Sequence, residues 1–370
     1  MTSAKRTGAI LTVDLNVLAK NFAYLKSKLN KGVNCSAVVK SDAYGLGLEP
    51  IVVRLSNEGC NKFFVAMLDE AIAVREILKK VDKDASIYML NGLPKDCEKE
   101  LDHYNVIPIL NSIKEIECWS AFAKVSNQIR HGVINIDTGM SRLGLDSGEL
   151  QRIALNPQIA EGINITHVMS HLACADNRMD NQNEQQRRLF DNYASHFGSV
   201  KLSLANSAGI FLGDNFHYDL VRPGAAIYGL QPIRNEINKI HQTIELKAKI
   251  IQTFFVDANA TVGYGATFRT TRKSRLATVS IGYGDGYFRS LGSRGYGYIG
   301  KIKVPIVGRI SMDLITFDVT DVREKDSSPG AMIELIGPNY TVDRLAMDAG
   351  TIGYEILTSL GSRYSRNYIS

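Results

Sequence analysis

The chain has 370 residues, 45% of them hydrophobic and 22% charged, and its formal net charge at pH 7 is +5. This length exceeds the usual limit of a single core and predicts one large and one smaller domain, in a composition that is ordinary for soluble proteins. Because Lys and Arg are scattered along the chain, we do not expect nucleic-acid binding.

The first apolar run, Ala9–Leu15, predicts a strand that precedes a helix capped by Asn16. The run is short and contains Asp14, which argues against a signal peptide, and no later stretch is long enough to span a bilayer. The five cysteines are odd in number and show no CxxC spacing, which predicts reduced thiols and no metal site. We therefore expect a cytoplasmic protein without a membrane partner.

From about residue 35 to residue 230, short β-branched runs alternate with amphipathic stretches. This alternation predicts an α/β fold of parallel strands joined by right-handed crossovers, and eight strands predict a closed (β/α)8 barrel. The expected helices include Asp69–Val81, Ser112–Val125 and Asn183–Phe197. The expected strands are Cys35–Lys40, Phe63–Leu68, Ser86–Leu90, Val106–Leu110, Val133–Asp137, Ile163–His171, Lys201–Asn206 and Leu220–Tyr228.

After about residue 240 the sequence becomes rich in β-branched residues and glycine, which predicts a mostly antiparallel β domain. An eight-strand barrel leaves no place for Ala9–Leu15, so we assign this strand to the same domain. The expected units are residues 1–15, 16–240 and 241–370. Within the last unit we expect strands at Glu245–Val256, Leu276–Ile281, Val304–Ile310 and Ile315–Val319, and a helical stretch at Val342–Met347.

Several chemically active side chains fall at the carboxyl ends of the predicted barrel strands. In such a barrel the functional groups gather on that face, and phosphate binds after strands seven and eight. Burial there lowers the pKa of a lysine and makes its amine a nucleophile toward an aldehyde, although a lone strand-end lysine more often reaches solvent. The residues are Lys40, Arg142, His171, Asn206, Ser207 and Arg222.

The string from Ala37 to Gly47, AVVKSDAYGLG, resembles the pyridoxal-phosphate (PLP) lysine motif of the alanine racemase family. Further strings that resemble family motifs follow in the expected order, so that the resemblance covers nearly the whole chain. They span residues 137–144, 220–230, 261–268, 281–287, 307–313 and 351–355. The resemblance implies a PLP-dependent alanine racemase with a barrel and a β domain.

This resemblance implies that Lys40 carries the cofactor and that Arg222 faces its pyridine nitrogen. Because a guanidinium only donates hydrogen bonds, the ring nitrogen then stays unprotonated, which weakens the ring as an electron sink and disfavours transamination. The other residues implied to bind the cofactor are Tyr44, Arg142, His171, Asn206, Ser207, Gly224, Ala225 and Tyr354. Those implied to bind the substrate are Arg142, Tyr283, Met312 and Asp313.

The resemblance also implies a head-to-tail homodimer, in which the β domain of one subunit completes the active site of the other through Tyr264, Tyr283, Met312 and Asp313. Tyr264 would remove the α-proton of L-alanine, and Lys40 would return a proton on the opposite face to give D-alanine for peptidoglycan. A phenol is a poor base at neutral pH, so we expect the cations Arg142 and His171 to assist Tyr264.

One position departs from the pattern of many family members. They carry a lysine two residues before the Asp-Thr-Gly string, modified to a carbamate that braces the arginine, whereas this chain has Asn135. A neutral amide supplies no negative charge, so the guanidinium of Arg142 needs another partner. We expect a small anion, with chloride the first choice, or the carboxylate of Asp137.

Three alternative functions stay open. A broader-specificity amino-acid racemase is expected to have an export signal, and Leu143 keeps the loop after Arg142 apolar. A barrel-type PLP decarboxylase is expected to place a carboxylate against the pyridine nitrogen and to use a cysteine in the β domain, whereas no cysteine follows Cys174. A non-racemising PLP-binding protein built of the barrel alone does not need the β-rich segment after residue 240.

Overall fold

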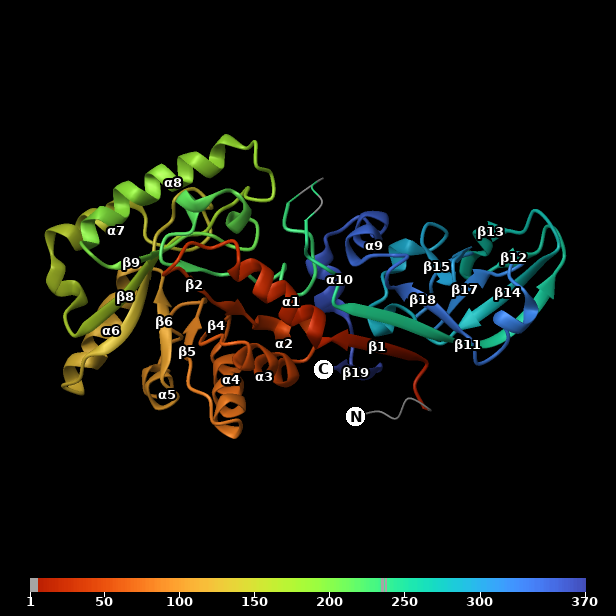
Figure 1. Cartoon of the computed structure of the whole chain (residues 1–370), viewed down its shortest axis with the longest axis horizontal. Helices are drawn as coiled ribbons and strands as arrows, with labels where there is room; N and C mark the ends of the chain where they lie inside the picture. The colour runs from red at the N-terminus through yellow and green to blue at the C-terminus, as the bar shows by residue number, and fades with distance from the viewer. Residues whose placement is uncertain (1–5, 234–235, 237) are drawn as a thin grey trace.

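The computed structural model describes residues 6–233, 236 and 238–370. These residues form an elongated molecule, with a barrel of parallel strands and surrounding helices at one end and a mostly antiparallel sheet at the other (Figure 1). The predicted combination of an α/β barrel and a β domain is confirmed.

The barrel has eight parallel strands, the first of which is interrupted at Ser36. Strands β3 to β9 form one seven-stranded sheet, and β10 is the eighth strand, which pairs with β2 on one side. On the other side a parallel bridge joins Asn206 to Arg222, and the Arg222 N–H donates to the carbonyl of Ala205 at 2.9 Å. The strands are β2 (Asn34–Cys35), β3 (Ala37–Val38), β4 (Lys62–Val65), β5 (Ser86–Met89), β6 (Val106–Leu110), β7 (Arg130–Asn135), β8 (Ile163–Met169), β9 (Lys201–Ser203) and β10 (Leu220–Val221).

Helices cover the outside of the barrel, which explains why β5 and β6 are continuous apolar runs rather than alternating ones (Figure 1). The helical elements of this part are α1 (Leu15–Lys26), α2 (Lys40–Gly45), α3 (Leu48–Asn57), α4 (Leu68–Lys80), α5 (Glu98–His103), α6 (Ile113–Val125), α7 (Ser147–Leu155) and α8 (Asn181–Ala194), of which α2 is a turn with left-handed backbone angles. Short 3-10 turns are η1 (Pro157–Ala160), η2 (Ser195–Phe197), η3 (Gly209–Phe211) and η4 (Asp214–Phe216).

Some predicted boundaries are wrong, for local reasons. The cap of α1 is Asp14 and not Asn16, because the Asp14 carboxylate accepts the N–H groups of Asn16 and Val17 at 2.9 and 3.0 Å. Strand β10 ends at Val221, and the chain then turns, with the N–H of Tyr228 donating to Ala225. Strand β3 ends before Lys40, which begins α2.

The β domain is built on the long strand β11 (Ile244–Val256). It pairs with β1 (Ala9–Asp14), β14 (Ser274–Val279) and β18 (Met332–Ile336), and β1 also pairs in parallel with β19 (Ser365–Ile369). The remaining strands are β12 (Thr261–Val262), β13 (Phe268–Arg269), β15 (Tyr296–Ile299), β16 (Ile302–Pro305) and β17 (Ile315–Asp318). The helical elements are η5 (Tyr264–Ala266), η6 (Tyr283–Asp285), η7 (Arg289–Leu291), η8 (Glu324–Asp326), α9 (Val342–Ala349) and α10 (Gly353–Ser359).

The two parts of the molecule meet where α2 lies against α10. Gly45, with φ +79°, comes so close to α10 that a Cβ there would lie 2.5 Å from the carbonyl oxygen of Leu357. The turn that follows Lys40 is therefore in direct contact with the β domain. Of the helices in the described ranges, every one is too short or too polar to cross a bilayer.

Candidate active site

Lys40 is presented by an unusual turn at the mouth of the barrel. The four residues that follow it, Ser41 to Tyr44, all have left-handed backbone angles, with φ between 52° and 58°. None of them is glycine, and each left-handed L-residue costs about 1–2 kcal/mol. Tertiary contacts must therefore hold this turn, and such strained segments are concentrated at functional sites.

The surroundings of Lys40 favour its neutral amine. Burial lowers the pKa of Lys40, the nearby Arg142 cation lowers it further, and the Glu70 carboxylate acts in the opposite direction. The neutral amine, which a lowered pKa makes more abundant, is the form of lysine that attacks an aldehyde. The structure thus supplies the environment that the sequence motif predicts for Lys40.

Arg222 directly follows strand β10 and is almost completely buried, with 3% of its surface exposed. Its guanidinium donates to the hydroxyl of Ser203, to the carbonyl of Ser170 and to the carbonyl of Leu204 at 3.3 Å. Burial lowers the pKa of Arg222 to about 9, which still leaves it protonated at neutral pH. The arginine is a fixed hydrogen-bond donor that cannot accept a proton.

His171 lies beside Arg222, with 3.5 Å between its Nδ1 and Nη2 of the arginine. Burial, followed by the charges of Arg222, Arg142 and Lys40, lowers the pKa of His171 to about 3. His171 is therefore neutral at physiological pH. The expectation that it is a cation is wrong, because three nearby positive charges and burial all oppose its protonation.

The residues after strands β9 and β10 form a compact cradle. The Ser207 hydroxyl accepts the N–H groups of Gly224 and Ala226 at 2.9 and 3.2 Å. A Cβ on Gly224 would lie 2.2 Å from the Tyr44 hydroxyl, so only glycine allows the phenol to reach this place. Asn206 accepts the N–H of Gly209 at 2.9 Å and so fixes the start of the next turn.

Two phenols converge on this cradle. The ring of Tyr44 stacks on Tyr228 at 4.5 Å and lies 6.1 Å from the ring of Tyr354 in α10. Burial raises the pKa of both Tyr44 and Tyr354, so each phenol keeps its proton and remains a hydrogen-bond donor. The Ser207 hydroxyl and the two protonated phenols are donors that can bind a phosphate, while the Gly224 and Ala226 amides hold the Ser207 oxygen in place. The cradle therefore fits the phosphate of PLP.

The loop that carries Arg142 is organised by Asp137. The Asp137 carboxylate accepts the N–H groups of Gly139, Met140 and Ser141 at 2.9 to 3.1 Å. This carboxylate is therefore engaged by its own loop. Of the two counter-charges considered for Arg142, the structure does not support Asp137.

Asn135 occupies the position where many family members carry the modified lysine. It is buried in β7, and its Nδ2 donates to Oδ1 of Asn111 at 2.8 Å. Asn111 uses its own Nδ2 on the carbonyls of Leu90 and Ile109, which fixes the orientation of both amides. The Oδ1 of Asn135 has no hydrogen-bond partner in the described part of the chain.

A second group of predicted residues lies in the β domain and is exposed. The exposed fractions are 74% for Tyr264, 54% for Met312 and 42% for Tyr283. Backbone hydrogen bonds join the Tyr283 turn to Ser311 and Met312, and Arg363 donates to the Asp313 carboxylate at 2.7 Å. The structure thus brings Tyr283, Met312 and Asp313 together.

Tyr264 is far from Lys40 within one chain. The short strands β12 and β13, which flank it, lie at the end of the β domain opposite to α2 (Figure 1). The turn around Tyr264 instead approaches Arg309, whose Nη1 would lie 2.9 Å from a Cβ on Gly265. A single chain therefore does not bring the two predicted bases together.

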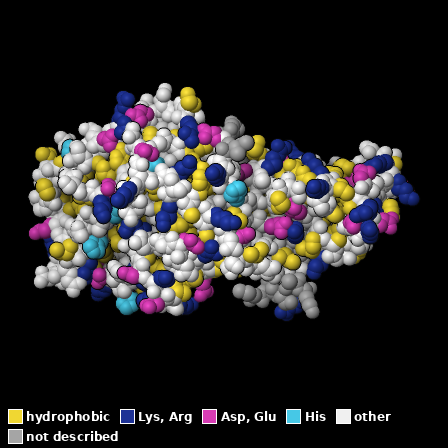
Figure 2. All heavy atoms as spheres, in the orientation of Figure 1, with side chains coloured by type: hydrophobic (Ala, Val, Ile, Leu, Met, Phe, Trp, Pro, Cys, Tyr) yellow, Lys and Arg dark blue, Asp and Glu magenta, His cyan; other side chains and the backbone are white. Residues whose placement is uncertain are grey.

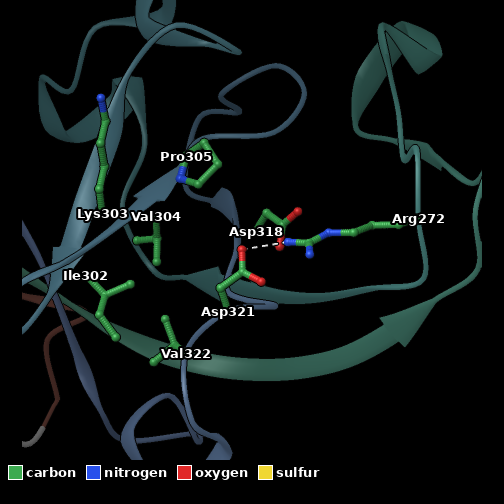
Figure 3. Close-up of a pocket in the computed structure, with 8 residues that line it drawn as sticks. All are labelled: Arg272, Ile302, Lys303, Val304, Pro305, Asp318, Asp321 and Val322. Atoms are coloured by element: carbon green, nitrogen blue, oxygen red, sulfur yellow. Dashed lines mark hydrogen bonds and ion pairs between the residues drawn. The ribbon is translucent and has the colours of Figure 1, made fainter.

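Away from Lys40, the described residues show mixed charge on one face of the molecule (Figure 2) and line two pockets. On the face shown in Figure 2, Lys and Arg side chains lie among Asp and Glu side chains over both parts of the molecule. One pocket of about 90 Å³ lies in the β domain, where the ion pair between Arg272 and Asp321 crosses it at 2.6 Å (Figure 3). Another, of about 290 Å³, opens near Lys62 at the opposite end of the barrel strands from Lys40.

Sequence reasoning missed several residues that support the site. Ser203 and Ser170 accept hydrogen bonds from Arg222, Asn111 orients Asn135, and Glu70 binds the backbone next to Lys40. A serine inside an apolar strand, as in Leu202-Ser203-Leu204, is the signal that could have identified Ser203. No local signal connects Glu70 with Lys40.

The chain resembles known proteins over its whole length. Residues 13–232 match the family model of the alanine racemase N-terminal domain, and residues 243–368 match that of the alanine racemase C-terminal domain. An alanine racemase of Rhodospirillum rubrum is 43% identical over 98% of this chain and 96% of its own length. A catabolic alanine racemase of Mesorhizobium japonicum is 41% identical over 99% of this chain and 95% of its own length.

Solved structures of alanine racemases also resemble this chain over nearly its whole length. The crystal structure of alanine racemase from Bartonella henselae, with covalently bound pyridoxal phosphate, superposes with a TM-score of 0.94 at 41% identity and covers 98% of this chain and 99% of its own. The biosynthetic alanine racemase from Pseudomonas aeruginosa superposes with a TM-score of 0.88 at 30% identity, with coverage of 98% of this chain and 100% of its own.

Proposed function

The chain belongs to the alanine racemase family, whose members are PLP-dependent isomerases, and we propose that it interconverts L-alanine and D-alanine. The observation that carries the proposal is the barrel mouth itself. There Lys40 has a lowered pKa, Arg222 is a buried donor, and Ser207, Gly224 and Tyr44 form a cradle that fits a phosphate. We further propose that the D-alanine supplies peptidoglycan synthesis.

Lys40 is the residue that would bind the cofactor covalently, and Arg222 would donate to its pyridine nitrogen. His171 would pack against the ring in its neutral form, while Asn206, Ser207, Gly224, Ala225, Tyr44 and Tyr354 would surround the phosphate. When bound, the cofactor withdraws electrons from the substrate α-carbon and makes the α-proton removable. Since Arg222 cannot give up a proton to the ring nitrogen, this withdrawal stays moderate, which favours return of the proton to the same carbon.

Two residues would move the proton, one on each face of the substrate. Tyr264, as the phenolate, would take the α-proton of L-alanine at its phenolic oxygen, and Lys40, as the protonated ammonium, would deliver a proton to the opposite face. The roles reverse for D-alanine, and each group contributes ordinary general acid–base catalysis. Arg142 would hold the substrate carboxylate, together with Tyr283, Met312 and Asp313.

The active site would require a second copy of the chain. Tyr264 is exposed, and the strands that flank it lie at the end of the β domain opposite to α2; Tyr283 and Met312 are exposed as well (Figure 1). A head-to-tail homodimer would place the exposed end of one β domain over the barrel mouth of the other chain. Such an arrangement buries these side chains and supplies the second base.

A small anion would compensate Arg142 near Asn135, and chloride is our first choice. Asp137 is engaged by its own loop and Asn135 is neutral, so neither side chain offers Arg142 a free negative charge. A crystal grown in bromide should show an anomalous peak between Arg142 and Asn135. A site filled only by water, without a carboxylate in contact, would contradict this part of the proposal.

The function is tested by two measurements on the purified protein with PLP. Borohydride reduction and peptide mapping should place the pyridoxyl group on Lys40, and a D-alanine assay should show racemisation. Attachment to another lysine would overturn the site. Faster turnover of other amino acids than of alanine would indicate the broader-specificity racemase, and attachment without any turnover would indicate a PLP-binding protein.

A further inference from the structure

The left-handed turn after Lys40 needs support at both of its ends. At its far end, Oδ1 of Asp42 accepts the N–H of Leu48 at 2.7 Å, and the Asp42 carbonyl accepts the N–H of Gly47 at 3.0 Å. At its near end, the first backbone N–H after the lysine is that of Ser41. The group that accepts it therefore controls the direction in which Lys40 leaves the barrel strand.

That acceptor is the side chain of Glu70. Its Oε1 accepts the N–H of Ser41 at 2.6 Å. Its Oε2 accepts the N–H groups of Ala66 and Met67 at 2.7 and 3.1 Å, and thereby caps α4. One carboxylate thus joins the loop after β4 to the residue next to Lys40, and hydrogen bonds to an ionised carboxylate are the stronger kind.

Two other barrel helices also have a glutamate as their third residue, and a comparison with them shows how the contacts of Glu70 differ. Glu115 in α6 and Glu149 in α7 are also the third residues of their helices. Glu115 accepts the N–H of Asn111 at 2.7 Å, and Glu149 accepts the N–H of Ile113 at 3.0 Å. Of the three, Glu70 is the one that binds the backbone beside Lys40.

Glu70 also contributes charge. Its carboxylate raises the pKa of Lys40, against burial and against the Arg142 cation, while His171 nearby is neutral. A change at Glu70 therefore has two separable effects. Loss of the hydrogen bond alters the position of the amine, and loss of the charge alters its protonation.

We propose that Glu70 is the positioning residue of Lys40: its carboxylate holds the Ser41 amide and thereby fixes the lysine side chain at the barrel mouth. This inference rests on the proposed function, in which Lys40 is the residue that binds PLP. A glutamine cannot replace the carboxylate, because one carbonyl oxygen cannot face both Ser41 and the Ala66–Met67 amides, and its NH2 group accepts no hydrogen bond.

The test measures how fast PLP attaches to Lys40 in cofactor-free protein as a function of pH, with borohydride mapping to confirm the lysine. For Glu70→Gln we expect the limiting rate at high pH to fall about tenfold, as one charge-assisted hydrogen bond is lost. The pH midpoint should shift downward by about half a unit or more, because a nearby negative charge is removed. Glu149→Gln, the matched control, should keep the wild-type rate and midpoint.

Glu70→Asp separates the two effects and serves if Glu70→Gln does not fold. It keeps the charge but is shorter, so it should attach PLP slowly with a midpoint near that of the wild type. Wild-type attachment kinetics in either Glu70 variant, with no more than the loss of unfolding free energy seen in Glu149→Gln, would show that Glu70 only caps α4 and would overturn the inference. Failure of the wild-type protein itself to attach PLP at Lys40 would instead refute the proposed function.

Discussion

At the barrel mouth, Arg222 is buried and already holds the hydroxyl of Ser203 and the carbonyls of Ser170 and Leu204, whereas Tyr264 at the far end of the β domain is 74% exposed. The first region is assembled within one chain, because its strands converge on the same face. The second region exposes side chains that are predicted to act in catalysis and substrate binding. The contrast teaches that the proposed cofactor half of the site is a property of the fold, whereas the proposed proton-transfer half would depend on association of two chains.

The largest expected effect comes from removing the exposed phenol. Tyr264→Phe should lower the racemisation rate by about a thousandfold, the range typical of general acid–base groups. PLP attachment and the free energy of unfolding should not change, since the side chain makes few contacts in the chain. Tyr193→Phe, on the barrel helix α8, is the control and should keep full activity. Normal racemisation by Tyr264→Phe would show that another group is the second base.

A substitution at the barrel mouth, unlike Tyr264→Phe, should lower the free energy of unfolding. Arg222→Gln should lower the free energy of unfolding by about 3 kcal/mol, because buried carbonyls and a hydroxyl lose their charged donor. PLP binding should weaken as well. Urea titration measures the effect, and Arg188→Gln, which breaks an exposed ion pair with Glu184, is the control, with an expected cost of about 0–1 kcal/mol. An equal, small cost for both variants would mean that the Arg222 network is not preorganised.

Acid should also affect the two regions differently, because the seven histidines all precede residue 242. Burial, followed by the Lys62 and Lys201 charges, lowers the pKa of His167 to about 4. The pKa of His167 is lower in the folded protein than in the unfolded chain. The contribution of neutral His167 to the free energy of unfolding is therefore complete above about pH 6.5, and it is lost by about 1.4 kcal/mol per pH unit as the pH falls toward 4. His171 acts in the same direction.

Hydrogen exchange at pH 7.5 and 5.5 measures this difference by region. Protection should fall in the barrel strands around His167 before it falls in β11 and β18. His167→Gln should flatten the pH dependence of the unfolding free energy in this range. An unchanged slope in the variant would show that His167 is not the group that titrates.

The smallest expected effect concerns Asn135. Since Asn135 cannot form a carbamate, activity should be the same, within about twofold, in buffer freed of carbon dioxide and in buffer with added bicarbonate. Replacement of chloride by a larger anion should lower activity more than removal of bicarbonate does. A steady-state assay in matched buffers measures both, and a strong dependence on bicarbonate would exclude the anion at Arg142.

Sequence patterns predicted the parts of the fold that are locally encoded. Strand β6, Val106–Leu110, was predicted with its observed bounds, because a buried parallel strand is a continuous apolar run between turn residues. The strand ending in Lys40 was predicted too long. Four consecutive left-handed residues without glycine contradict local preference, and only tertiary contacts such as the bond from Ser41 to Glu70 stabilise them.

The site, like the fold, could be predicted from the sequence only where local patterns and topology determine it. The strand-end positions of Lys40, His171 and Arg222 follow from barrel topology, which places all carboxyl ends on one face. The protonation state of His171 does not, because it depends on the spacing of Arg222, Arg142 and Lys40 in three dimensions. The hydrogen bond from Asn135 to the amide oxygen of Asn111 could not be predicted from the sequence either, because Asn111 follows a neighbouring strand.

Mixed dimers provide the most direct test of a site shared between two chains. Lys40→Ala and Tyr264→Phe subunits should each be inactive as homodimers. A heterodimer of the two contains one site with both Lys40 and Tyr264, so mixing them after reversible dissociation should restore up to about half of the wild-type activity per heterodimer, if the two sites act independently. Heterodimers that form, as shown by native mass spectrometry, but stay inactive would contradict a shared active site.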